Sequence, residues 1–284
     1  MTIRPGALAG LALAAACAVT PARAARSYDN CTGFIDSLPA TITTAGTWCL
    51  RKDLNTAVSS GQAILVASNN VTVDCNDFRI GGLPAGAGTQ AWGINAEGRL
   101  NITVRNCSIR GFLYGIRLRN EGGGHLVEDN RLDGNTSNGI SIEGEGNLVR
   151  GNRILNTGGS TAPGYQGGAD GIVAYDDTDI IDNEISGVGG AGTDVASSGI
   201  VLIYPTHASV RGNRIRGLTA SGAGSAVGIH LGTVYSLAIF RDNEVVGPGA
   251  IGISCAEAGS RAQGNTVVGF TTPIANCRDD GNSL

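Results

Sequence analysis

The dipeptide Gly-Ile recurs at short intervals along this 284-residue chain, and a repeat of this kind constrains the fold more than any other feature of the sequence. The pairs are Gly93-Ile94, Gly115-Ile116, Gly139-Ile140, Gly171-Ile172, Gly199-Ile200, Gly228-Ile229 and Gly252-Ile253. An asparagine follows each pair at a similar distance; these are Asn106, Asn130, Asn152, Asn183, Asn213, Asn243 and Asn265. Self-similarity at this period predicts a solenoid in which each repeat forms one coil.

Each repeat reads as short strands separated by glycine and polar bends. Leu148-Val149 and Ile154-Leu155, for example, flank the turn at Asn152. Runs this short and rich in β-branched residues are typical of parallel strands, whereas the 45 glycines of the chain disfavour long helices. The spacing of the pairs varies because some repeats carry Gly- and Ser-rich insertions. We expect these insertions to form loops over one face, at residues 157–169, 187–198 and 218–226.

With these repeats and turn asparagines, the chain resembles the right-handed parallel β-helix family, which has the pectin-lyase-like fold. The resemblance covers roughly Cys31 to Cys277. It implies an all-β protein, a single right-handed parallel β-helix solenoid of about eight to nine coils with an internal asparagine ladder. A side-chain amide suits such a ladder because it offers a donor and an acceptor to coils stacked about 4.8 Å apart. The family contains lyases, hydrolases, epimerases and non-catalytic proteins, so the fold leaves the function open.

The N-terminal segment indicates export. Arg4 precedes an apolar stretch at 7–19, and Ala22-Arg23-Ala24 fits a cleavage site. We therefore expect a secreted or periplasmic protein; the alternative is an outer-surface lipoprotein modified at Cys17, which would be its route to a membrane. The expected organisation is a signal peptide at 1–24, an N-terminal cap and entry coil at 25–60, β-helix repeats at 61–270 and a C-terminal cap or tail at 271–284.

Removing the signal peptide leaves six of the seven cysteines, and an even number in an exported protein favours disulfides. Closeness in sequence suggests pairing Cys31 with Cys49 and Cys255 with Cys277. Cys75 and Cys107 stand beside Asn76 and Asn106, which we interpret as equivalent ladder positions on neighbouring coils, where the coil spacing suits a disulfide. Six cysteines permit many pairings, so the sequence leaves the connectivity open. Disulfides at both ends would stabilise the open ends of a solenoid.

The charges exclude one class of partner. The net charge is −4, Lys52 is the single lysine and no basic cluster exists, so nothing favours nucleic acid. We expect a monomer whose partner is a polysaccharide, with no cofactor. Residues 189–194 match half of a calcium-binding nonapeptide once, without the stacked copies such a site needs, so no motif supports calcium. The residues after the ladder asparagines predict an ion ladder across coils; they are Arg131, Arg153, Glu184, Arg214 and Glu244.

The strand that begins at each Gly-Ile pair carries the candidate site, because the resemblance implies a substrate groove along one sheet. If isoleucine points inward, alternation along the strand sets the outward residues. These are Asn95 and Glu97, Arg117 and Arg119, Ser141 and Glu143, Val173 and Tyr175, Val201 and Ile203, and His230 and Gly232. Further polar residues stand at the strand ends, namely Asp170, Asp176, Asp177, Tyr204 and His207.

Two chemistries fit these residue types. A uronate lyase or epimerase needs a cation to neutralise the sugar carboxylate, together with a base and an acid. A hydrolase needs two carboxyl groups, for which Asp176 and Asp177 with Asp170 are the candidates. The predicted catalytic residues are Tyr175, Asp176, Asp177, His207 and His230. The predicted substrate-binding residues are Arg117, Arg119, Glu143, Asp170 and Tyr204, and no metal ligands are predicted.

No complete catalytic motif accompanies these residues. Tyr114-Gly115-Ile116 resembles the catalytic strand of alginate epimerases, but Arg117-Leu118-Arg119 replaces the expected Asp-Pro-His-Asp run. Tyr175-Asp176-Asp177 resembles the paired aspartates of polygalacturonase-like hydrolases without their flanking elements. Two hypotheses remain. The first is a secreted lyase or hydrolase acting on an acidic polysaccharide, and the second is a non-catalytic β-helix that binds glycans or forms part of the cell surface.

Overall fold

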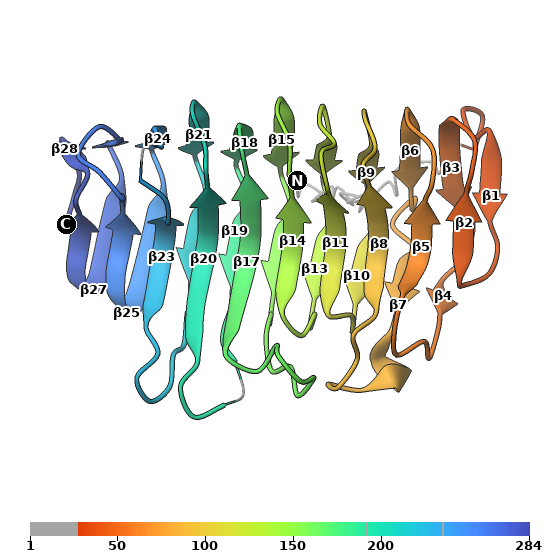
Figure 1. The fold of residues 1–284 in the computed structure, drawn as a ribbon, viewed down its shortest axis with the longest axis horizontal. Helices are drawn as coiled ribbons and strands as arrows, with labels where there is room; N and C mark the ends of the chain where they lie inside the picture. Colours follow the sequence, from red (N-terminus) through yellow and green to blue (C-terminus); the bar gives the residue numbers. More distant parts are fainter. Residues whose placement is uncertain (1–27, 191, 235) are drawn as a thin grey trace, which may run out of the picture.

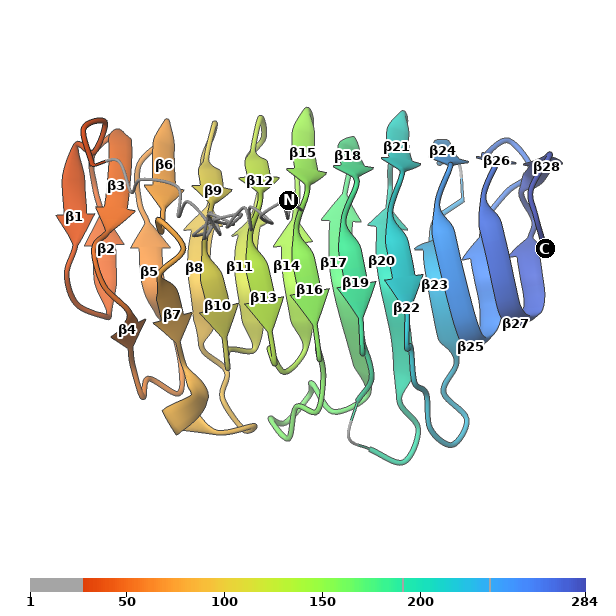
Figure 2. The same ribbon diagram turned by 180° about the vertical axis from the view of Figure 1, so that it is seen from behind.

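The computed structural model describes residues 28–190, 192–234 and 236–284 and shows an all-β solenoid of about nine turns, as predicted. The predicted signal peptide and Cys17 lie outside the described residues. Strands from successive coils pair in parallel and form long sheets that run from β1 at one end to β28 at the other (Figures 1 and 2). The three strands of each coil enclose a continuous apolar core.

Three faces result from this stacking. The A face is an eleven-stranded sheet of β1 Gly33–Ile35, β3 Gly46–Leu50, β6 Val71–Asp74, β9 Thr103–Arg105, β12 Leu126–Glu128, β15 Asn147–Arg150, β18 Thr178–Ile181, β21 Ala208–Arg211, β24 Ala238–Arg241, β26 Arg261–Gln263 and β28 Arg278–Asp280. The Gly-Ile face contains β2 Ala40–Ile42, β5 Gln62–Val66, β8 Trp92–Glu97, β11 Tyr114–Arg119, β14 Asn138–Ile142, β17 Gly168–Tyr175, β20 Ala196–Ile203 and β23 Ala226–Leu231.

The third face contains β4 Leu54–Asn55, β7 Arg79–Gly81, β10 Ser108–Arg110, β13 Arg131–Asp133, β16 Arg153–Leu155, β19 Glu184–Ser186 and β22 Arg214–Arg216. Two long strands, β25 Glu244–Ser254 and β27 Thr266–Ala275, run without interruption from the third face into the Gly-Ile face. A short 3-10 helix, η1 Leu83–Ala85, lies in the connection between β7 and β8.

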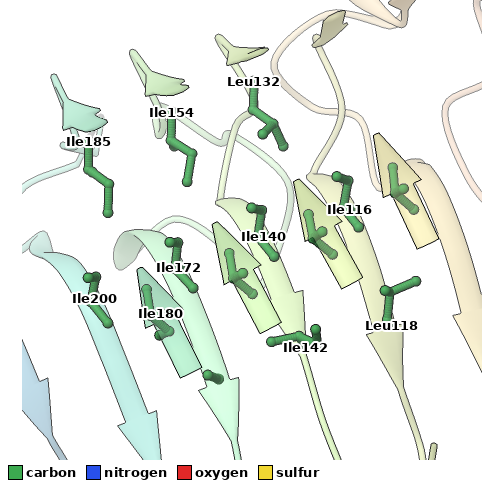
Figure 3. Packing of buried hydrophobic residues seen from close by; sticks show 14 of the residues in the cluster. Ile116, Leu118, Leu132, Ile140, Ile142, Ile154, Ile172, Ile180, Ile185 and Ile200 are labelled. Atoms are coloured by element: carbon green, nitrogen blue, oxygen red, sulfur yellow. The ribbon is translucent and has the colours of Figure 1, made fainter. Parts of the chain in front are cut away.

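Identical side chains stack on one another through the core. Ile116, Ile140, Ile172 and Ile200 occupy one register on the Gly-Ile face, and all are fully buried. The third face supplies a second row, which Figure 3 shows at Leu132, Ile154 and Ile185. The constant coil spacing therefore lets each isoleucine contact its equivalent in the next coil, which explains why the sequence repeats the residue.

The glycine of each pair is required by close approach. A Cβ at Gly171 would lie 2.5 Å from the carbonyl oxygen of Gly199 and 2.7 Å from Cγ2 of Ile185. The same clash arises at Gly139, where a Cβ would lie 2.6 Å from the carbonyl oxygen of Gly171. No side chain fits between the coils at this point, so the repeat retains glycine.

Buried asparagine amides join the coils at the turn between the A face and the third face. Asn183 is representative: its Nδ2 donates to Oδ1 of Asn213 at 3.0 Å and to the carbonyl oxygen of Val149 at 3.0 Å. Its Oδ1 accepts the backbone N–H of Asn152 at 2.9 Å. The predicted ladder is confirmed, and its members are Asn130, Asn152, Asn183, Asn213, Asn243, Asn265 and Asn282.

Two predicted ladder positions, Asn76 and Asn106, were wrong. Asn76 has a φ of 47°, and its Nδ2 donates to the carbonyl oxygen of Leu50 at 3.3 Å rather than to an asparagine. Asn106 stands one residue before the ladder row, with a φ of 52°, and corresponds to Asp129, with a φ of 53°. Cys107 occupies the ladder position itself, since its backbone N–H donates to Oδ1 of Asn130 at 3.0 Å. A left-handed backbone favours asparagine, aspartate or glycine, so the asparagine at 106 serves the turn conformation rather than the ladder. At the other end Asn282, which the repeat did not predict, extends the ladder.

A second internal stack lies at the start of the A-face strands and contains a buried histidine. The backbone N–H of Ile102 donates to Nδ1 of His125 at 3.2 Å, and the N–H of His125 donates to Oδ1 of Asn147 at 2.9 Å. Burial lowers the pKa of His125 to about 4, from an ordinary value of 6.5. His125 is therefore a neutral structural residue at neutral pH, equivalent in place to the asparagine of the next coil.

The three predicted disulfides are confirmed, and two of them lie near the ends of the solenoid. They are Cys31–Cys49, Cys75–Cys107 and Cys255–Cys277, with Cα separations of 5.8, 4.7 and 5.1 Å. Disulfides persist in oxidising compartments, so they indicate an extracytoplasmic location. In the described part of the chain, no helix is long and apolar enough to cross a membrane.

The predicted ion ladder forms on the third face except at Arg131, which pairs with Asp133 of its own strand at 2.6 Å. Glu184 stands between Arg153 and Arg214 in the strand register, as expected. Its carboxylate pairs with Arg153 at 3.1 Å and with Arg216, while Arg214 pairs with Glu244 at 3.2 Å. These pairs are largely solvent-exposed, so each contributes only a few tenths of a kcal/mol, roughly, to stability.

We expect Gly171→Ala to lower the free energy of unfolding by about 1 to 3 kcal/mol, because the added methyl group must displace the Gly199 carbonyl or Ile185. Gly167→Ala is the matched control, since a Cβ there meets no atom within 4 Å and lies outside the left-handed region. Urea unfolding of both variants measures the difference. Equal stability of the two variants would contradict the close-approach argument.

His125 should make the protein acid-labile in a defined range. The unfolded chain takes up a proton near pH 6.5 whereas the folded chain resists until about pH 4, so stability is complete above this range and falls as the pH decreases through it. The loss is on the order of 3 kcal/mol. In His125→Asn, whose amide oxygen can accept the Ile102 N–H, this part of the pH dependence should vanish. Parallel stability curves for the two proteins between pH 6.5 and 4 would refute this.

Candidate functional site

The Gly-Ile face has two different ends, and this asymmetry positions the candidate site. Loops 156–167, 187–195 and 217–225 lead into β17, β20 and β23 at the same end, which is the lower end in Figure 1. The predicted loops are confirmed, but the last residues of each predicted range belong to the strand that follows the loop. The opposite ends of β17 and β20 run into tight corners at 176–177 and 204–207.

Arg117 forms the first cluster of side chains on this face. It projects from β11, as the alternation predicted, and its Nη1 donates to Oδ1 of Asn95 at 3.0 Å and to Glu97 on β8. The guanidinium also lies over the Trp92 ring, 4.4 Å from its centroid. Only 13% of the Arg117 side chain is exposed, so the cation is both paired and stacked.

Arg119 forms a similar cluster two residues along the strand. Its Nε lies 3.1 Å from Oε2 of Glu143, and its guanidinium lies 4.0 Å from the centroid of the Tyr175 ring. Partial burial opposes ionisation of Glu143, but the hydrogen bond from Arg119 lowers the pKa of this carboxyl. Both charges are thus held in place by each other and by the aromatic ring.

Two tyrosines contact each other at the loop end of the Gly-Ile face. Tyr165, in the loop before β17, packs edge-on against Tyr114, with 6.2 Å between ring centroids. Burial raises the pKa of Tyr114, and the neighbouring Tyr165 adds to the effect. Tyr114 therefore stays protonated at neutral pH and keeps a hydroxyl donor on this face.

Asp170 lies in the register row of Tyr114, beside Asn138 on β14 and Ser198 on β20. Burial raises the pKa of this carboxyl to about 6, although a hydrogen bond with Ser198 opposes the shift. Among the described residues no arginine or lysine offsets the burial, so Asp170 holds its proton at a higher pH than an ordinary aspartate.

The predicted aspartate pair occupies the corner that directly follows Tyr175 at the end of β17. Asp176 has a φ of 59°, and its Oδ2 accepts the backbone N–H of Gly144 at 3.2 Å. Asp177 accepts the backbone N–H groups of Thr206 and His207 at 2.7 and 2.8 Å and the Thr206 hydroxyl at 2.7 Å. Burial opposes ionisation of Asp177, but these hydrogen bonds lower its pKa. Both carboxyls join adjacent coils, which is a structural use.

His207 and Tyr204 project from the next corner. The His207 side chain is 84% exposed and lies 3.5 Å from Asp177, on the side that turns towards the A face. Tyr204 is 65% exposed and has a φ of 58°, with its backbone N–H donating to Oγ1 of Thr233 at 2.7 Å. Both residues lie in the corner between β20 and β21, so neither lies on a strand of the Gly-Ile face.

His230 does project from the Gly-Ile face, as predicted, but further along the solenoid. It pairs in register with Val201 and Ser254, and burial lowers its pKa. Four strand spacings separate it from Arg117, which corresponds to about 19 Å.

The predicted residues therefore divide into two groups. One group shares the Gly-Ile face: Arg117, Arg119, Glu143, Asp170, Tyr175 and, at a distance, His230. The other group lies at the corners: Asp176, Asp177, Tyr204 and His207. Among the described residues, no group of three or more His, Cys, Asp or Glu side chains is arranged to hold a metal ion.

Three aromatic residues of the strip were missed as site candidates, and one of them, Tyr114, stands before its Gly-Ile pair just as Trp92 does. Trp92 stands before the Gly-Ile pair, so an alternation counted forward from isoleucine does not reach it. Tyr165 lies in a loop, where no periodicity assigns a direction. We call one set of nine residues on this face the aromatic strip. It consists of Trp92, Glu97, Tyr114, Arg117, Arg119, Glu143, Tyr165, Asp170 and Tyr175.

A polar cleft borders the strip at its loop end. It has a volume of about 490 Å³ and lies between the loops that precede β17 and β20. Its lining consists of Ser160, Thr161, Gln166, Gly167, Gly192, Thr193 and Asp194. Gln166 follows Tyr165 directly, and Gly167 stands three residues before Asp170, so the cleft adjoins the strip along the chain.

Comparison with known proteins identifies the family. The family described as the right handed beta helix region matches residues 43–198 and 92–272, which together span most of the chain. The chain belongs to this right-handed β-helix family. The predicted resemblance to the right-handed parallel β-helix family is confirmed. No curated protein matches the chain in a sequence comparison.

Two solved structures match this β-helix protein at low sequence identity. The Dettilon tailspike protein gp208 is 19% identical with a TM-score of 0.56, and the match covers 87% of this chain and 51% of the tailspike chain. The chain thus spans about half the length of that protein. The Azotobacter vinelandii mannuronan C-5 epimerase AlgE6 A-module is 13% identical with a TM-score of 0.49, over 88% of this chain and 79% of the module. The likeness to the tailspike shows the fold alone.

Asp170→Asn should stabilise the β-helix above about pH 6. At that pH the unfolded chain has already ionised the carboxyl, whereas the folded chain must ionise it in a poorly solvated place, so the wild type loses stability. The expected gain is about 1 to 2 kcal/mol, and it should disappear below about pH 4, where both states hold the proton. Thermal unfolding across this range measures it, with the exposed Asp179→Asn as control. A destabilised Asp170→Asn at pH 7 would overturn the assignment.

Proposed function

We propose that this β-helix protein binds a polysaccharide along the aromatic strip, between β8 and β17. The observation that supports the proposal is the strip itself, in which two arginines, each paired with a glutamate and stacked on an aromatic ring, lie beside a tyrosine pair. Sugars present apolar ring faces and hydroxyl groups that both donate and accept. Preorganised rings and paired polar groups offer complementary contacts to both.

The row geometry favours this function because parallel strands repeat at a fixed spacing. Outward side chains on β8, β11, β14 and β17 recur every strand, about 4.8 Å apart. A polymer laid across the strands meets a new set of contacts at each coil, so several weak subsites act together. The family comparisons supply the fold and not this function, which rests on the residues of the strip.

The hydrolase hypothesis receives less support from the same geometry. Paired catalytic carboxyls stand roughly 5 to 9.5 Å apart. Asp176 follows Asp170 by six residues along an extended strand, which separates them by about 20 Å. Asp177 is already engaged by three hydrogen bonds from the next coil. We therefore keep hydrolysis by these aspartates as a weaker alternative.

The lyase hypothesis meets a similar difficulty. Its base would be His207, which lies at an exposed corner, or His230, which stands four strands from Arg117. Its cation would be Arg117 or Arg119, and both are already paired with glutamates. An acid, a base and a free cation within reach of one sugar ring are what such a reaction needs.

Asp170 supports a second candidate function, which is acid catalysis on the bound sugar. Its carboxyl has a pKa raised to about 6 by burial, a shift that suits a proton donor near neutral pH. Under this candidate, Asp170→Asn abolishes product formation from a polysaccharide that the protein still binds. We further propose that the protein is secreted or periplasmic and monomeric, with polysaccharide as its partner.

A binding screen with paired variants tests the proposal. The purified protein is assayed against a panel of polysaccharides by affinity electrophoresis and calorimetry. Arg119→Ala should weaken binding by about tenfold, because it removes the side chain that holds Tyr175 and Glu143 in place. Arg153→Ala is the matched control, since Arg153 pairs with Glu184 at the same 3.1 Å on the third face.

Two results would contradict the proposal. The first is no binding to any polysaccharide of the panel. The second is an equal loss of polysaccharide affinity in Arg119→Ala and Arg153→Ala, which would show that binding does not depend on the Gly-Ile face. The same incubations, analysed for reducing ends and for unsaturated-uronate absorbance, reveal any accompanying catalysis.

A further inference from the structure

Each arginine of the aromatic strip is paired with a glutamate, and this charge balance indicates which class of polysaccharide the strip favours. Arg117 is matched by Glu97, and Arg119 is matched by Glu143. Only 13% and 24% of the two arginine side chains are exposed, and the aromatic rings of Trp92 and Tyr175 cover part of each guanidinium. The strip therefore offers no unpaired cation to a ligand.

A charged ligand would meet a penalty on this surface. A uronate carboxylate placed near either arginine would have to displace a glutamate or lie beside it, and like charges in close contact disfavour one another. Asp170 adds a further acidic group to the same face. Lys52, the single lysine of the chain, lies in the entry coil before β4 and not on the strip.

The adjoining cleft carries the same chemistry. Its lining residues Ser160, Thr161, Gln166 and Thr193 are uncharged and bear hydroxyl or amide groups. Its one carboxylate, Asp194, accepts the backbone N–H of Ala223 at 2.8 Å and so has a structural partner. A volume of about 490 Å³ is within the range of small-ligand clefts.

From this charge balance we infer that the ligand is a neutral polysaccharide, whose chain lies on the aromatic strip and enters the cleft between the loops preceding β17 and β20. The inference rests on the proposed polysaccharide-binding function and narrows it to one class of glycan. Hydroxyl groups fit the Ser, Thr and Gln lining, and the paired arginines and glutamates offer donors and acceptors without net charge. The acidic polysaccharide expected from the sequence would need free cations that the strip lacks.

The test compares neutral gluco-oligosaccharides with oligogalacturonate and oligomannuronate by calorimetry on the full mature protein. Neutral oligosaccharides should bind with an affinity unchanged between about 0.05 and about 0.5 M NaCl, because no ion pair forms. Tyr165→Ala and Gln166→Ala should each weaken this binding by about tenfold. Val268→Ala, an exposed residue on β27 remote from the strip, is the matched control.

A gain of function completes the design. The double variant Glu97→Gln, Glu143→Gln leaves both arginines without their carboxylates and should acquire salt-dependent binding of uronate oligosaccharides that the wild type lacks. Circular dichroism checks that this variant is folded, and single Glu143→Gln serves as the milder substitution.

The outcomes separate the two claims. Salt-dependent binding of uronates by the wild type would overturn the neutral assignment and leave polysaccharide binding intact. If neither neutral nor uronate oligosaccharides bind, both the neutral assignment and the proposed polysaccharide binding are wrong. If Tyr165→Ala and Gln166→Ala leave the affinity for neutral oligosaccharides unchanged, the ligand does not bind in the cleft. A folded double variant that gains no uronate binding would show that arginine pairing does not set the specificity.

Discussion

The hydrogen bonds between buried asparagine amides set the spacing on which the rest of the molecule depends. In each bond an Nδ2 of one coil donates to an Oδ1 of the next at about 3 Å, so adjacent coils are held at one separation at this turn. With the turn fixed, the β-ladders on all three faces stay in register for coil after coil. Core isoleucines then stack on isoleucines, and outward side chains stack in rows that a long ligand can contact repeatedly.

The same regularity limits the places where function can develop. Between coils the backbone approaches so closely that Gly139 and Gly171 have no room for a side chain. Asparagine amides fill the turn between the A face and the third face, and Arg–Glu pairs occupy the third face itself. Variation is confined to outward rows and to loops at one end of the Gly-Ile strands. The aromatic strip and the polar cleft lie where these two variable regions meet, which is why they form the candidate site.

Much of the fold was predictable because its signals are periodic. Glycine at the close approach, isoleucine in the core and asparagine in the ladder each recur once per coil. The two terminal disulfides were predicted from closeness in sequence, and Cys75–Cys107 from their equivalent places in neighbouring coils. The error at Asn106 has a local cause: an αL turn and a ladder both select asparagine, and the two positions are adjacent. The site was less predictable. Alternation placed Arg117, Arg119 and Tyr175 on the strip, but the corner contacts of Asp176 and Asp177 and the loop position of Tyr165 depend on tertiary structure.

The most direct test of the account is a crystal structure of the protein with a bound neutral oligosaccharide. The account predicts sugar rings across β8, β11, β14 and β17, in contact with Tyr165 and with one end in the cleft lined by Gln166 and Thr193. Both Arg–Glu pairs should remain intact in the complex. An oligosaccharide bound to the A face, to the third face or at the His207 corner would contradict the assignment of the Gly-Ile face as the binding surface.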